Sequence, residues 1–369
     1  MKKVLYFIQV PPPIHGVSTI NKYVLESEII NQNIEKKLLE IKFSNSVQEL
    51  THFSFSKFFK FVKLFFSLFK TLFTFKPDFV YFSLMPVGKG FYRDFMYVLL
   101  MKLFCTKIIF HIHNSGINNK KHSFIKSKMY KCVFNNSFII HLSEGLLQKE
   151  IVPLNLKNAK LFAVNNGVEI VEIQKLKIEK SKVNILFLSN LFPEKGVFTI
   201  LNVFNDLYAE NTNIQLDIVG ENFLNENKKI REFISNNKLE KSVFLHENIH
   251  NENKFPFFEK ADIFAFPSQL KCESFPLVLL EAMMFKLPIV AYKIGAVSEI
   301  VQNNESGFVA ELGNISDFKT KLKTLIENTE LRTKFGEKAQ EIYLEKYTKN
   351  VFEKNMKITF DEIIFNSKL

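Results

Sequence analysis

The feature that most constrains the fold is a regular alternation between short apolar runs, rich in β-branched and aromatic residues, and longer stretches with helical periodicity. This alternation is typical of βαβ units, whose consecutive strands lie parallel in one sheet. Strands are expected at Val4–Val10, Phe79–Ser83, Lys107–His111, Phe138–Leu142, Asn184–Leu188, Gln215–Val219, Val243–Leu245, Ile263–Phe266 and Pro288–Ala291. The chain is therefore expected to be an α/β protein.

The length of 369 residues is more than one hydrophobic core usually serves, so two domains are expected, each with its own sheet. The polar stretch Glu169–Lys182, rich in Lys and Glu, separates the two groups of strands and is interpreted as a linker. The domains are accordingly placed at residues 1–170 and 171–348. A C-terminal helix at about 349–369 is expected to pack back on the first domain.

The positive charge lies in the first half of the chain. Residues 1–170 carry 23 basic and 10 acidic side chains, whereas residues 171–369 carry 26 and 28. The first half can therefore attract an anionic surface such as phospholipid, an acidic glycan or nucleic acid.

Cysteine usage and the N-terminal segment indicate the compartment. Cys105, Cys132 and Cys272 are widely spaced and form neither a C-x-x-C motif nor a Cys/His cluster, so the sequence supports no disulfide framework and no zinc site. A reducing compartment is expected. The apolar stretch MKKVLYFIQV runs directly into three prolines and is too short for a signal peptide, so it is interpreted as a first buried strand.

One segment departs from the alternation: Ser56–Phe75, with the sequence SKFFKFVKLFFSLFKTLFTF. On a helical wheel its polar residues fall in an arc of roughly 220–320°, counted from Lys57. Lysines in mid-segment argue against a membrane span, because each charge is costly at the bilayer centre. Two interpretations stay open. The helix lies in a membrane interface with Lys57, Lys60, Lys63 and Lys70 on anionic lipid, or it packs on its own sheet with its lysines toward water.

The strongest candidate site lies in the segment Cys272–Glu299. Glu273 precedes a Ser-Phe-Pro turn, and a helix is expected to follow, with Pro276 in its first turn and Glu281 further along. Unpaired amides at a helix N-terminus bind phosphate, and carboxylates accept hydrogen bonds from sugar or ribose hydroxyls. The segment is therefore a candidate nucleotide-sugar site.

This pattern of Glu, seven residues, Glu, then Ala-Met and Pro-Ile-Val resembles glycosyltransferase family 4. The resemblance covers nearly the whole chain and implies the GT-B architecture, two facing Rossmann-like domains with parallel sheets and an interdomain cleft. It implies that Glu273 contacts the donor sugar, that Glu281 binds the ribose, and that Phe275 and Pro276 present backbone near the diphosphate. It also implies transfer with retention of anomeric configuration.

A second motif, Leu188–Gly196, joins a buried strand to a helix and places Lys195 at the carboxyl edge of a parallel sheet, where ligands of such sheets bind. A lysine there can bind a diphosphate and stabilise it as it leaves. The similar loop of the family usually has arginine at the position of Asn190. Because an amide cannot neutralise phosphate, either Lys195 acts alone or another base, from the first domain, takes that role.

Two loops of the first half are also placed at the site. Gly16 follows the first strand in a Pro-rich loop, where glycine lets the backbone approach a phosphate, while the role of His15 stays open. His113 follows the Lys107–His111 strand and matches the histidine that the family places beside the donor sugar. His111 is expected to face the same side as His113, so the choice between them stays open. Lys286 stands where the family commonly has glycine, and it is expected to alter a helix end rather than the site.

The chain contains no Asp-x-Asp motif, so no carboxylate pair is evident for a bridging cation, and transfer without metal or other cofactor is expected. The expected function is transfer of a sugar from a nucleotide-diphosphate sugar to a glycan or lipid-linked acceptor in cell-surface polysaccharide biosynthesis. The expected location is cytoplasmic, on the inner face of the membrane, with no nucleic-acid partner. The alternatives are a nucleotide-sugar epimerase on the same fold and a non-catalytic lipid-binding protein.

Overall fold

The computed structural model describes residues 1–42, 55–104, 106–118, 123–172, 182–221, 226–249 and 251–366 of the chain. Within these residues, the strands form two six-stranded sheets in which all neighbouring strands run parallel. The chain divides into two compact units, Met1–Gly167 with Lys349–Leu369, and Val168–Thr348. The expected α/β class with two Rossmann-like domains is confirmed.

The first unit is built on a sheet with the strand order β2-β1-β3-β4-β5-β6. Its inner strands are buried on both faces, as parallel sheets require. The strands are β1 Lys2–Ile8, β2 Ile34–Glu40, β3 Phe79–Phe82, β4 Lys107–Ile112, β5 Phe138–His141 and β6 Lys160–Ala163.

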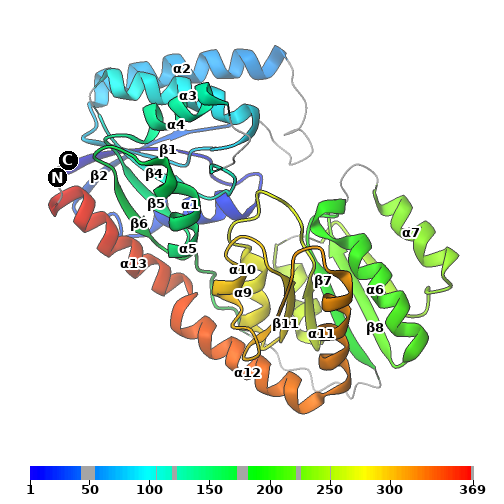
Figure 1. Cartoon of the computed structure of the whole chain (residues 1–369). Coiled ribbons are helices and arrows are strands. Elements are labelled where there is room, and N and C mark those ends of the chain that lie inside the picture. Colours follow the sequence, from blue (N-terminus) through cyan, green and yellow to red (C-terminus); the bar gives the residue numbers. More distant parts are fainter. Residues whose placement is uncertain are drawn as a thin grey trace. The chain divides into compact units, whose positions relative to one another are not determined.

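Helices cover both faces of this sheet (Figure 1). The helices are α1 Gly16–Glu26, α2 Phe55–Phe75, α3 Gly88–Leu103, α4 Phe124–Phe134, the short α5 Glu144–Leu146 and α13 Lys349–Asp361. Buried side chains of α2, α3 and α4 form one core with those of β1, β3 and β4. The C-terminal helix α13 lies against α1 and the opposite face, where Phe360 packs on Tyr81 of β3.

The second unit has the strand order β12-β11-β10-β7-β8-β9. Its strands are β7 Val183–Leu188, β8 Ile214–Gly220, β9 Val243–Glu247, β10 Ile263–Phe266, β11 Ile289–Tyr292 and β12 Gly307–Ala310. Its helices are α6 Val197–Glu210, α7 Glu226–Asn236, α8 Phe255–Lys260, α9 Leu277–Met284, α10 Val297–Ile300, α11 Ile315–Glu327 and α12 Thr329–Lys346. The main core of this unit joins α6, α7 and α11 to one face of the sheet.

Each strand expected from the sequence is present, with bounds that differ by about two residues or fewer. The sequence did not indicate β2, β6 and β12, which are all edge strands. Residues 173–181 of the expected linker lie outside the described residues.

Candidate functional site

The strand order of the second unit creates a switch point between β7 and β10. From β7 the chain proceeds outward through β8 and β9, and it then returns to the other side of β7 for β10, β11 and β12. Loops that leave the carboxyl ends of β7 and β10 therefore diverge, and ligands of open α/β sheets bind in the crevice that such loops form. Both sequence motifs of this unit lie in these two loops.

Lys195 and Glu273 meet at this switch point. Lys195 ends the short 3₁₀ helix η4 (Pro193–Lys195) after β7, and Glu273 lies in the loop after β10. Lys195 Nζ donates to Glu273 Oε2 at 2.7 Å, and Ser268 Oγ donates to the same oxygen at 2.9 Å. The side chains of Lys195 and Glu273 are only 16% and 9% exposed. The structure thus brings together a cation and a carboxylate that the sequence placed in separate motifs.

Two glycines allow the loops to approach this closely. Gly196 has a φ of +91°, and a Cβ there would lie 2.1 Å from the carbonyl oxygen of Pro267 at the end of β10. Gly295 has a φ of +54°, and a Cβ there would lie 2.4 Å from the carbonyl oxygen of Ser274. Only glycine combines this backbone conformation with the absence of a side chain. These two residues therefore hold the loops after β7 and β11 against the loop that carries Glu273.

The helix expected after Glu273 is α9, with one correction. Pro276 is the N-cap of α9, with extended backbone, rather than a residue of its first turn. Phe275 turns inward, is 5% exposed and packs edge-on against Tyr347, so its backbone is what it offers to a ligand. In α9, the Glu281 carboxylate accepts a hydrogen bond from Lys254 Nζ at 2.6 Å.

Lys254 and Ser268 were not identified from the sequence. Lys254 ends the short helix η5 (Asn251–Lys254), and it is 24% exposed where it contacts Glu281. Neither residue belongs to a recognisable motif. The fold brings Lys254 to Glu281 from a separate segment, whereas Ser268 lies in the same loop as Glu273. Together they give both glutamates a fixed hydrogen-bond donor.

Asn190 and Lys286 are the two departures from the family pattern. Asn190 lies at the start of the Lys195 loop, where its carbonyl oxygen accepts a hydrogen bond from Phe192. Lys286 follows the C-cap of α9 with a φ of +59°, a conformation that favours glycine. Lys286 therefore affects a helix end, as expected.

In the first unit, His113 lies directly after β4 and is 7% exposed. The ring of His111 is fully buried with its centroid 4.0 Å from that of His113, so the expectation that both face one side is confirmed. His111 Nδ1 pairs with the hydroxyl of Tyr81, while the Nε2 atoms of both histidines are buried and have no partner among the described residues. His111 is thus anchored inside the sheet, and His113 lies at its edge.

Burial keeps these imidazoles neutral. It lowers the pKa of His113 to about 3, assisted by nearby His141 and His15, and it lowers the pKa of His111 well below the usual range. Burial also lowers the pKa of His141, on the adjacent strand β5, to about 3. At neutral pH, His113 can therefore donate or accept a hydrogen bond without bringing charge.

The other loop of the first unit holds Gly16 and His15. His15 is the N-cap of α1, with its Nδ1 accepting from the Ser18 backbone N–H and the Ser18 hydroxyl accepting from the His15 N–H. This capping box is the role that the sequence left open for His15. Gly16, the first residue of α1, is exposed.

Glu150 fixes the loop that follows His113. Its buried carboxylate accepts hydrogen bonds from the backbone N–H groups of Gly116 and Asn118, both at 3.0 Å. No sequence motif marks Glu150, which comes from the short helix η2 (Leu147–Ile151). It positions the His113 loop from outside any motif.

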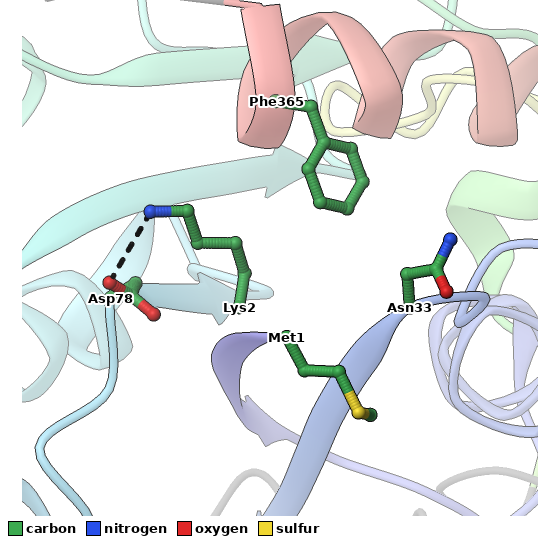
Figure 2. A pocket seen from close by; sticks show the side chains of 5 residues that line it. All are labelled: Met1, Lys2, Asn33, Asp78 and Phe365. Carbon is green, nitrogen blue, oxygen red and sulfur yellow. Dashed lines mark ion pairs between the residues drawn. The ribbon is translucent and has the colours of Figure 1, made fainter.

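The first unit has a surface hollow of about 550 Å³. Figure 2 shows the side chains that line it, which are Met1, Lys2, Asn33, Asp78 and Phe365. Lys2 begins β1 and Asp78 precedes β3, so the hollow lies at the amino ends of these strands. The carboxyl ends are where ligands bind, and the exposed ion pair between Lys2 and Asp78, at 3.8 Å, is a surface feature. The hollow is not the site.

The described residues offer neither a cluster of metal ligands nor a membrane-spanning helix. No group of three or more His, Cys, Asp or Glu side chains in the described ranges is arranged to hold a metal ion. Across the part of the chain that the structure covers, no helix combines the length and apolar character needed to cross a bilayer.

The two parallel-sheet units define the class of the fold. HepE of Anabaena, solved in complex with UDP, superposes with a TM-score of 0.75 at 18% identity, covering 98% of this chain and 100% of that one. A likeness at this identity shows the fold, which is that of GT-B glycosyltransferases.

The family follows from the sequence of the second unit. The family model described as "Glycosyl transferases group 1" matches residues 169–342. These residues are therefore similar to the glycosyl transferases group 1 family, and the resemblance recognised around Glu273 and Glu281 is confirmed for this part of the chain.

Two curated relatives illustrate the range of the family. An uncharacterized glycosyltransferase of Haemophilus influenzae is 30% identical over 217 residues, which cover 57% of this chain and 58% of the relative. The poly(ribitol-phosphate) alpha-N-acetylglucosaminyltransferase of Staphylococcus aureus is 26% identical over 250 residues, 67% of this chain and 49% of the relative. The chain thus spans about half to three fifths of the length of these relatives.

Proposed function

We propose that this chain is a glycosyltransferase that moves a sugar from a nucleotide-diphosphate sugar to a membrane-associated, lipid-linked glycan acceptor in cell-surface polysaccharide biosynthesis. The observation that carries the proposal is the pairing of Lys195 with Glu273 at the switch point of a group 1 domain. The names of the relatives support the reaction class and the polysaccharide context. The proposed location is cytoplasmic, on the inner face of the membrane.

The chemistry of each residue that is proposed to bind the nucleotide-sugar donor suggests its role. Lys195 and the backbone amides of Phe275 and the start of α9, after Pro276, bind the diphosphate, since these are cationic or dipolar donors. Glu273 accepts from sugar hydroxyls, and Glu281, oriented by Lys254, accepts from the ribose. Asn190 and Gly16 add polar and backbone contacts, and His113 serves as a neutral hydrogen-bond partner of the sugar.

The proposed reaction is a same-face displacement that needs no metal. The bond between the anomeric carbon and the phosphate oxygen breaks, and its electron pair leaves with the nucleoside diphosphate, whose charge Lys195 stabilises. An acceptor hydroxyl forms the new bond on the face that the phosphate leaves, and the hydroxyl proton passes to the departing phosphate oxygen. Retention of configuration follows from this geometry. It is proposed because no side chain of the site stands out as a covalent nucleophile.

The test is incubation of the full chain with UDP-glucose, UDP-N-acetylglucosamine or GDP-mannose, with and without a bacterial lipid extract, followed by ³¹P and ¹H NMR. The expected result is nucleoside diphosphate that forms only with the extract, in the presence of chelator, together with a retained anomeric configuration in the lipid fraction. A changed sugar that is still attached to its nucleotide, formed without extract, would identify an epimerase instead. Lys195→Ala is expected to lower the rate at least about 100-fold.

A further inference from the structure

Helix α2 has three faces, although its sequence suggested only two. On a wheel counted from Lys57 at about 100° per residue, the side chains packed on the sheet span roughly 320–80°. The exposed lysines Lys60, Lys63 and Lys70 span roughly 220–300°. Between them, at roughly 100–200°, lies an arc of exposed phenylalanines. Its members are Phe58, Phe59, Phe66, Phe69 and Phe73, which are 45–69% exposed.

This arrangement answers the question that the sequence left open. The helix does pack on its own sheet, through Leu68, Leu72 and their neighbours. A second apolar arc, which that packing does not use, nevertheless remains at the surface. A solvated helix face normally carries polar residues, so packing on the sheet does not account for the phenylalanine arc. The side chain of Lys57, the fourth lysine expected at a membrane, lies outside the described residues.

Helix α3 extends the same surface. Its outward stripe consists of Tyr92, Met96, Leu99 and Leu103, spaced as one face of a helix and 38–77% exposed. Helices α2 and α3 lie side by side (Figure 1), and Phe69 of α2 contacts Phe104, next to Leu103, edge to face at 5.6 Å. The two stripes therefore neighbour each other, and we call the exposed phenylalanines of α2 with this stripe the apolar strip.

Basic residues border the apolar strip on both sides. Its outer border is the lysine arc of α2, and beyond α3 lies α4 with exposed Lys128 and Lys131. Residues 51–134 contain 14 basic and only two acidic residues. One of these, Asp94, is fully buried with Arg93 at 2.7 Å, and the other, Asp78, pairs with Lys2 at the amino end of the sheet. The surface around the strip is therefore apolar and cationic, with no exposed carboxylate on α2, α3 or α4.

We propose that the apolar strip and its flanking lysines dock the first unit on an anionic lipid bilayer. Aromatic and aliphatic side chains would enter the acyl boundary while the lysine ammonium groups contact lipid phosphates. A second copy of the chain is a poorer occupant, because a two-fold contact would place lysine borders against each other. The charge pattern thus selects an anionic lipid surface. This docking face rests on the proposed function only for its purpose, which is to bring the enzyme to a lipid-linked acceptor.

The first test is co-sedimentation of the full chain with vesicles of phosphatidylcholine alone or mixed with phosphatidylglycerol. The wild type is expected to bind the mixed vesicles, and to bind them less as salt rises. The double variant Phe66→Asp/Leu103→Asp is expected to lose about tenfold or more in affinity, since two apolar side chains that would enter the bilayer are replaced by charges. The matched control is Leu312→Asp/Leu344→Asp in the second unit, where both leucines are 51% exposed. This control should bind as the wild type does.

The second test addresses charge. Lys63→Glu/Lys70→Glu is expected to weaken binding to mixed vesicles about 20-fold or more, because each lysine near an anionic surface contributes about 1 kcal/mol. The control Lys228→Glu/Lys241→Glu reverses two exposed lysines of the second unit and should leave binding unchanged.

Several outcomes would overturn the docking face. These are an absence of wild-type binding to mixed vesicles, or an equal loss in the variants and their controls. A third is a dimer that Phe66→Asp/Leu103→Asp converts to monomer while vesicle binding stays intact, which would assign the strip to a second copy. Nucleotide binding, measured for the wild type and the same variants, tests the transferase function separately from the docking face. Vesicle binding without nucleotide binding would support the docking face and refute the transferase. Nucleotide binding without vesicle binding would support the transferase and refute the docking face.

Discussion

The ion pair between Lys195 and Glu273 offers a quantitative test of the site. Removing either partner leaves the other side chain, 16% or 9% exposed, without its charge partner. Breaking a buried pair in this way costs about 3–5 kcal/mol, and the access of solvent to Lys195 places the expected cost near the lower end, about 3 kcal/mol for each single alanine variant. Removing both side chains leaves mainly the Ser268 hydroxyl without its acceptor. The double variant is therefore expected to lose about 1 kcal/mol of folding free energy beyond the loss caused by truncating the two side chains.

A double-mutant cycle of Lys195→Ala and Glu273→Ala should therefore show a coupling free energy of about 2 kcal/mol or more. The chain has no tryptophan, and its two units need not unfold together. Hydrogen exchange of the β7 and β10 amides, followed by mass spectrometry under increasing urea, reports the opening of the second unit alone.

The control cycle uses Lys228 and Glu232, an exposed pair on α7 at 3.9 Å, for which coupling of about 0.5 kcal/mol or less is expected. If the Lys195 and Glu273 variants are additive to within about 0.5 kcal/mol, the pair is solvated. Glu273 would then not be held in place for a ligand, and Lys195 and Glu273 would not form the centre of the site.

Three further predictions follow from single features of the structure. Lys286→Gly should raise the free energy of unfolding of the second unit by about 1 kcal/mol, because Lys286 adopts a left-handed conformation, and a fall measured in urea would contradict this. Burial lowers the pKa of His113 and His141 to about 3, whereas histidines of the unfolded chain titrate near the ordinary value of about 6.5. The contribution of these two neutral imidazoles to folding stability is therefore complete above pH 6.5 and is lost as the pH falls toward 3. Between pH 7 and pH 5 these two histidines should cost the first unit about 4 kcal/mol, and His141→Gln should recover roughly half of this loss in urea titrations at both pH values. Lys254→Ala should weaken nucleotide binding about fivefold by freeing the Glu281 carboxylate, whereas Lys254→Arg should bind nearly as the wild type does, and equal affinities for both variants in calorimetry would refute the orienting role.

The sequence revealed the strands whose apolar character comes from burial on both faces. Central strands such as β3 and β10 are entirely buried, so each reads as an uninterrupted apolar run. The strands that the sequence missed lie at sheet edges. Strand β2, with the sequence IEKKLLE, is largely exposed, while β6 and β12 are only partly buried. Their pairing is imposed by the neighbouring strand, which local sequence does not encode.

The sequence predicted those parts of the candidate site in which a chemically active side chain lies in one short segment with a glycine or proline that the backbone requires. Lys195 with Gly196, and Glu273 with Pro276, are of this kind. Lys254 and Glu150 are not, because each acts on a motif through a contact between distant chain segments that only the fold creates. In the same way, the wheel of α2 showed which residues are polar but not which apolar arc the sheet would cover.

In the proposed function, the second unit binds a nucleotide-activated sugar through the carboxylates of Glu273 and Glu281. The most direct test of this binding is calorimetry of UDP, GDP and ADP and their sugar conjugates with the full chain in chelator, comparing the wild type, Glu281→Ala and the control Glu327→Ala at an exposed position. The expected result is binding of one nucleotide family without metal, weakened about tenfold or more by Glu281→Ala and unchanged by Glu327→Ala. An absence of binding by the wild type, or equal binding by Glu281→Ala and the wild type, would rule out this donor site.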